Sequence, residues 1–147
     1  MLKDALLEIF ERELDKLANE INSYTDENKL WTLAGGISNS GGNLCLHLLG
    51  NLNHFVGATL GASGYVRDRE SEFSSAGVTR EDLLASIEKT KQVVTETLHK
   101  LTDESFEQNF PVEKHDRAVK TDFMLLHLLA HFNYHLGQIN YHRRLTA

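Results

Sequence analysis

A single proline, Pro111, stands among the 147 residues, so helix breakers are absent from almost the whole chain. Proline interrupts a helix because it lacks a backbone N–H and its ring clashes with the preceding turn. Apolar residues elsewhere recur at three- and four-residue spacings, which is the period of one helix face. The sequence therefore predicts an all-α protein, and its length suits one domain over residues 1–147.

Four segments carry this helical period. They are expected at 2–24, about 43–60, about 80–100 and about 122–145. Ser40 and Thr79 are suited to cap the second and third helices. Glycine and other turn residues fill 25–42, 61–79 and 102–120, which are expected to be irregular. The 61–79 connector is longer than the roughly 2–8 residues of a tight helix connection, so it can cross a bundle and place the second and third helices parallel.

Charge and composition exclude several classes of protein. The formal net charge of −6 disfavours nucleic acid and anionic membrane surfaces, which both require a basic face. The N-terminal segment is charged from its third residue and has no long apolar run, so we expect a cytoplasmic protein without a membrane span. Cys45 is the only cysteine, so we expect a thiol in the core and no cysteine-based zinc site. His115 lies among charged residues and is expected to be solvated.

The last predicted helix carries an unusual number of histidines. His127, His131, His135 and His142 follow one another at steps of four, four and seven residues. Such steps keep side chains on or near one stripe of a helix, and Gln138 falls on the same stripe. An apolar stripe runs beside it, so this helix is expected to face the core with imidazoles along one edge.

The second predicted helix is apolar on most sides but has one polar stripe, formed by Asn43, His47, Asn51 and His54. A buried polar group without a partner costs on the order of 1–3 kcal/mol. A row of four therefore predicts water, a metal ion or a ligand cavity on that side of the helix.

His131 and His135 are one helical turn apart and can chelate one divalent ion. The segment HFNYH lacks the glutamate of the helical HExxH motif, so a metalloprotease site is rejected. A third ligand must come from another helix, and His47 is the best-placed candidate. Three imidazoles plus one open position can activate water or bind a substrate. Zinc and nickel are the expected ions, although imidazole accepts several first-row metals.

These residues also allow other interpretations. Asn51 and Gln138 are expected to orient ligands or substrate, whereas His54, His127 and His142 are more typical of cavity lining or surface. The alternative is that all these histidines are satisfied polar groups in a wet core. A di-iron carboxylate centre is rejected, because its Glu-x-x-His signature occurs only once, at Glu96 and His99.

The segments HLLAHFNYHLGQINYHRR and GNLCLHLLGNLNHFVGATLG resemble the DinB-like (DinB/YfiT) superfamily of metal-dependent enzymes, and the similarity spans essentially the whole chain. The resemblance implies a four-helix bundle with a long crossover between helices 2 and 3. It also implies one divalent ion held by three histidines, which correspond to His47, His131 and His135. Homodimers are common among the superfamily's members.

Characterised members of the superfamily include transferases and isomerases that use low-molecular-weight thiols. The resemblance therefore implies a metal-dependent enzyme that activates such a thiol (S-transferase-like) or water (hydrolase-like) toward a small electrophile, as a homodimer. The alternative is a non-catalytic metal-binding or small-molecule-binding dimeric bundle.

Overall fold

The computed structural model describes residues 1–112 and 116–147, so the expectation for His115 lies outside the described residues. The regular elements of the described part are all helical, apart from one isolated bridge between Asn109 and Lys120. They are α1 (Leu2–Ser23), the 3₁₀ helix η1 (Glu27–Trp31), α2 (Gly41–Leu52), the π-helix η2 (Asn53–Leu60), α3 (Arg69–Ser74), α4 (Arg80–Lys100), α5 (Asp103–Glu107) and α6 (Thr121–Thr146).

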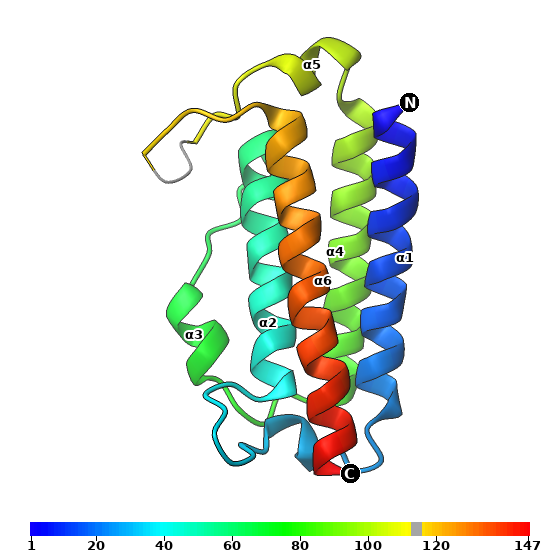
Figure 1. The fold of residues 1–147 in the computed structure, drawn as a ribbon, viewed down its shortest axis with the longest axis vertical. Helices are drawn as coiled ribbons and strands as arrows, with labels where there is room; N and C mark the ends of the chain where they lie inside the picture. Colours follow the sequence, from blue (N-terminus) through cyan, green and yellow to red (C-terminus); the bar gives the residue numbers. More distant parts are fainter. Residues whose placement is uncertain (113–115) are drawn as a thin grey trace.

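Helices α1, α2 with its extension η2, α4 and α6 form a four-helix bundle (Figure 1). Helix α1 lies beside α4 and α6, and α2 lies beside the same two helices on the other side. Helices α2 and α4 run in the same direction, while α1 and α6 run opposite to them (Figure 1). This arrangement confirms the predicted all-α bundle and its long crossover between the second and third long helices.

The predicted apolar faces form the core. Leu6, Phe10 and Leu14 of α1 are almost completely buried, as are Leu83 and Ile87 of α4. The apolar stripe of α6 is buried over its whole length: Leu125, Leu128, Leu129, Phe132, Leu136 and Ile139. Burial of these side chains is the main source of stability, at about 25 cal/mol per Å² of apolar surface removed from water.

Helix α2 begins two residues earlier than predicted. Ser40 caps it as expected, because its hydroxyl accepts from the backbone N–H of Asn43 at 3.1 Å. The prediction assigned Gly41 and Gly42 to the loop because glycine is a common loop residue. Instead, both lie inside the helix at points of close approach. A Cβ at Gly41 would overlap the hydroxyl of Tyr24, and one at Gly42 would lie 2.7 Å from the Trp31 ring.

The 61–79 connector was predicted to be irregular throughout, and that prediction was wrong for α3. Asp68 caps this short helix by accepting from the backbone N–H of Ser71. Helix α3 lies against the outer side of α2 (Figure 1). Six residues are too few to show a helical period in sequence, whereas the contact with α2 stabilises them as a helix.

None of the helices in residues 1–112 and 116–147 combines the length and apolarity needed to cross a lipid bilayer.

Cys45 is fully buried, as predicted, and burial raises the pKa of its thiol to about 12. We therefore expect the native protein to resist a thiol-specific reagent at pH 8, because the thiolate is the reactive form. The check is a labelling time course with and without denaturant. One thiol should react promptly after unfolding, and equally fast labelling of the native protein would contradict this placement.

Candidate metal centre

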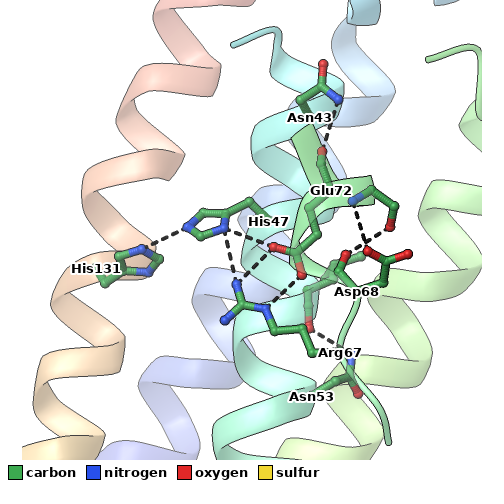
Figure 2. A network of polar contacts seen from close by, with 9 residues as sticks. Asn43, His47, Asn53, Arg67, Asp68, Glu72 and His131 are labelled. Carbon is green, nitrogen blue, oxygen red and sulfur yellow. Dashed lines mark hydrogen bonds and ion pairs between the residues drawn. The ribbon is translucent and has the colours of Figure 1, made fainter. Parts of the chain in front are cut away.

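Three histidines from two helices converge at mid-height in the bundle. His47 projects from α2, and His131 and His135 project from successive turns of α6. Each offers one ring nitrogen, and the three nitrogens all lie within 4.8 Å of one another. The shortest separation joins Nε2 of His47 and Nε2 of His131 at 3.1 Å (Figure 2). These three histidines, hereafter the histidine cluster, could hold a metal ion.

The donor set fits a divalent transition ion. Tetrahedral zinc with Zn–N distances of about 2.0–2.1 Å separates its ligand nitrogens by roughly 3.3 Å. The spacing between His47 and His131 is already close to that value. The remaining spacing, at most 4.8 Å, is within the reach of side-chain rotation, since His135 is only half-buried. Three imidazoles without a carboxylate or thiolate suit zinc, nickel and related ions alike.

Glu72 fixes the ring of His47 on the side away from the cluster. Its Nδ1 lies 3.1 Å from Oε1 of Glu72, and both side chains are buried. Because the carboxylate can only accept, this contact favours a proton on Nδ1 and leaves the Nε2 lone pair facing the cluster. Burial lowers the pKa of His47, against the opposing effect of the hydrogen bond to Glu72. The neutral imidazole needed for metal binding is therefore favoured.

His135 has a similar support from within its own helix. Its Nδ1 lies 2.7 Å from Oε1 of Gln138, one turn further along α6. An amide oxygen accepts, so Nδ1 carries the proton and Nε2 retains its lone pair. Gln138, which was expected to orient ligands or substrate, thus contacts the ring of one of the three clustered histidines.

Glu72 is held in turn by Arg67, which also lies in the crossover. Arg67 donates from Nε to Oε2 at 2.8 Å and from Nη2 to Oε1 at 2.9 Å. Figure 2 shows the carboxylate in contact with both the guanidinium and the His47 ring, which also lie close to each other. This bidentate pair is charge-assisted and geometrically restrictive, and it compensates the buried negative charge.

Three other predicted residues lie outside the histidine cluster. Asn51 is buried one turn after His47 on α2. His54 lies in η2, where its ring packs edge-on against Phe55 with centroids 4.7 Å apart. His127 is half-buried one turn before His131. The cluster consists of one residue from α2 and two from α6, and these three side chains are not part of it.

His142 was expected to line a cavity or the surface. It does line a cleft beside His135, and it is also a structural residue near the end of α6. It is buried, and its Nε2 donates to the backbone carbonyl of Thr32 at 2.7 Å. Its Nδ1 accepts from the hydroxyl of Tyr24, also at 2.7 Å. Burial, with a smaller contribution from Glu20, raises the pKa of the Tyr24 hydroxyl, so it remains a donor. His142 thus ties together the end of α1, the loop after η1, and α6.

Sequence reasoning missed Glu72 and Arg67. Both lie in a segment whose mixed charges are typical of a solvated loop, and an acidic residue in a connector is usually exposed. Only the packing of α3 on α2 buries Glu72. A weak signal exists in the Asp68 cap and the acidic residues after it, which are typical of a helix N-terminus.

A cleft of about 500 Å³ borders the histidine cluster at His135. Within the described part of the chain, no aspartate, glutamate, lysine or arginine lines it. The lining residues are Ile37, Ser38, Asn39, Leu44, Tyr134, His135, Gln138, Tyr141, His142 and Leu145. Apolar and aromatic side chains with a few polar groups are typical of small-molecule sites.

Two solved structures share this architecture. A DinB-like protein from Bacillus cereus aligns over 97% of this chain and 91% of its own, with 16% identity and a TM-score of 0.74. A DinB-like protein from Bacillus subtilis aligns over 95% and 90%, with 16% identity and a TM-score of 0.70. Among curated proteins, none is significantly similar to this chain.

The fold and the histidine cluster define a DinB-like helical bundle with three histidines that could bind a metal ion. A family model for proteins of unknown function, DUF1572, matches residues 3–146. The chain belongs to this DUF1572 family.

Proposed function

We propose that this protein is a metal-dependent enzyme that uses a divalent transition ion, zinc or nickel, bound by His47, His131 and His135. The observation that carries the proposal is the convergence of three imidazole nitrogens within 4.8 Å. Glu72 and Gln138 support two of these rings on their other nitrogens. Such outer hydrogen bonds orient the rings and are a regular feature of histidine metal sites.

Three protein ligands leave one coordination position for a reactant. A divalent ion there would supply Lewis acidity that favours the deprotonated form of a thiol or of water. The chain's own residues would hold the reactants. His135 belongs to the cluster and lines the cleft, and its hydrogen-bond partner Gln138 lines the cleft as well. We propose that a low-molecular-weight thiol or water attacks a small electrophile there.

The lining of the cleft supports an uncharged electrophile with an apolar part. Tyr134, Tyr141 and Leu145 expose apolar surface toward solvent in this region. Ser38 and Asn39 add a few hydrogen-bonding groups. Apart from the proposed ion, the lining of the cleft offers a charged substrate no ionic partner to offset its loss of hydration.

Turnover of metal-loaded protein with paired substrates tests this function. A panel of thiols combined with uncharged electrophiles, such as an activated aryl halide and an epoxide, should reveal consumption that depends on the metal. His131→Ala protein should show none. Consumption without thiol would assign hydrolysis, whereas inactivity with every combination would contradict the enzyme and favour a non-catalytic metal-binding bundle.

Metal affinity should fall as the pH falls. Protons compete with the ion for the imidazoles, whose ordinary pKa is about 6.5, so the apparent affinity should decrease progressively below that pH. The contribution of His47 should begin at a lower pH than that of an ordinary imidazole, because burial lowers its pKa. Competition with a chelator of known affinity between pH 5.5 and 7.5 measures this, and an affinity independent of pH would argue against histidine ligation.

A further inference from the structure

We infer that Glu72 is a positioning residue for the candidate metal centre: it holds His47 in the Nδ1–H tautomer, with Nε2 directed to the cluster. This inference deepens the proposed function and concerns a residue from the crossover, not from the bundle itself. It rests on the contacts of Glu72 with α2 and with Arg67.

Asn43, one turn before His47 on α2, attaches the crossover to this helix through two hydrogen bonds. The carboxamide of Asn43 donates to the backbone carbonyls of Glu72 at 3.0 Å and Ser75 at 2.7 Å. Asn43 is itself fixed, since its carboxamide oxygen accepts from the hydroxyl of Ser40 at 2.7 Å. Figure 2 shows Asn43 and His47 meeting the crossover on the same side of α2. The backbone of Glu72 is therefore fixed independently of its carboxylate.

Gly50 leaves the space that the carboxylate occupies. A Cβ at this position would overlap Oε2 of Glu72, although Gly50 lies in the last turn of α2, where the helix continues directly into η2. Glycine weakens a helix interior relative to alanine, so a glycine here has a local cost. The packing explains why glycine occupies this position, because any larger residue would push the carboxylate away from His47.

Two contacts at Nδ1 of His47 bear on its tautomer. Nη2 of Arg67 approaches Nδ1 at 3.3 Å, and Oε1 of Glu72 approaches it at 3.1 Å. The Arg67 nitrogen already donates to Oε1 at 2.9 Å, whereas the carboxylate can only accept and makes the shorter contact with Nδ1. The Nδ1–H form, with Glu72 as acceptor, therefore satisfies all three groups.

Nitrogen-15 NMR of the metal-free protein tests the inference without any reaction. Long-range correlations to the imidazole nitrogens distinguish the two neutral tautomers. We expect Nδ1–H for His47 in the wild type and an increased Nε2–H population in Glu72→Ala. An Nε2–H tautomer in the wild type would overturn the inference.

Metal titrations of matched variants provide the second test. Glu72→Ala should bind zinc 10–100-fold more weakly than wild type, about the usual cost of losing such a partner. Glu72→Gln retains an acceptor oxygen and should recover part of that loss. Gly50→Ala should also weaken binding, whereas Gly137→Ala, where a Cβ meets nothing within 4 Å, should not. Circular dichroism of each metal-free variant verifies that it is folded.

Wild-type affinity in Glu72→Ala would overturn the role of Glu72 and leave the proposed function standing. Absence of zinc binding in the wild type would contradict the proposed function, while the tautomer of His47 would still decide the role of Glu72.

Discussion

Replacing His131 with alanine should lower the affinity for zinc or nickel by more than about 100-fold, because loss of a direct ligand should exceed the 10–100-fold cost of losing a supporting group. His131 presents Nε2 to Nε2 of His47 at 3.1 Å, so it is central to the cluster. His47→Ala and His135→Ala should show losses of similar size. Isothermal titration or chelator competition at pH 7.5 measures the change.

His99→Ala is the matched control, since this histidine is exposed in the last turn of α4. It should bind the ion as the wild type does. Equal losses in His99→Ala and His131→Ala, or none in either, would show that the ion binds elsewhere on the chain.

Replacing His142 with alanine should lower the free energy of unfolding by about 2–4 kcal/mol while leaving metal affinity unchanged. The substitution removes the hydrogen bonds of His142 to Tyr24 and to Thr32. It deprives the Tyr24 hydroxyl of its imidazole acceptor and leaves a cavity in place of the ring. Tyr24→Phe removes only the hydroxyl and should cost about 1 kcal/mol. Chemical denaturation of the two single variants and the double variant measures both effects.

The double variant should be less destabilised than the sum of the single variants, because the two side chains share one hydrogen bond. Strict additivity would contradict that contact. A loss of metal affinity in His142→Ala, without a loss of fold, would assign this histidine to the metal centre instead of the end of the bundle.

The long helices could be predicted because each buries one continuous face. Leu6, Phe10 and Leu14 recur every four residues in α1, as Leu83 and Ile87 do in α4. All five side chains are buried in the core. The start of α2 could not be predicted in the same way. Gly41 lies inside α2 where the close approach of Tyr24 leaves no room for a Cβ, and a contact between residues far apart in the chain leaves no local pattern.

In the candidate site, too, some residues follow from helical spacing and others depend on tertiary contacts. His131 and His135 are one turn apart on one helix, so their proximity follows from helical geometry alone. Placing His47 opposite them required only a polar stripe on a second buried helix. Glu72, in contrast, reaches His47 through a crossover whose six-residue helix has no sequence period. The histidine cluster was therefore predictable, whereas the carboxylate that contacts it was not.

The most direct test of this account is X-ray absorption spectroscopy, with elemental analysis, on protein purified without a histidine tag and reconstituted with zinc. The account predicts one ion per chain, with three imidazole ligands and one further light-atom ligand. It also predicts that His131→Ala protein retains less than stoichiometric metal. A wild-type protein that takes up no stoichiometric ion, or an ion whose spectrum lacks imidazole scattering, would contradict the central claim.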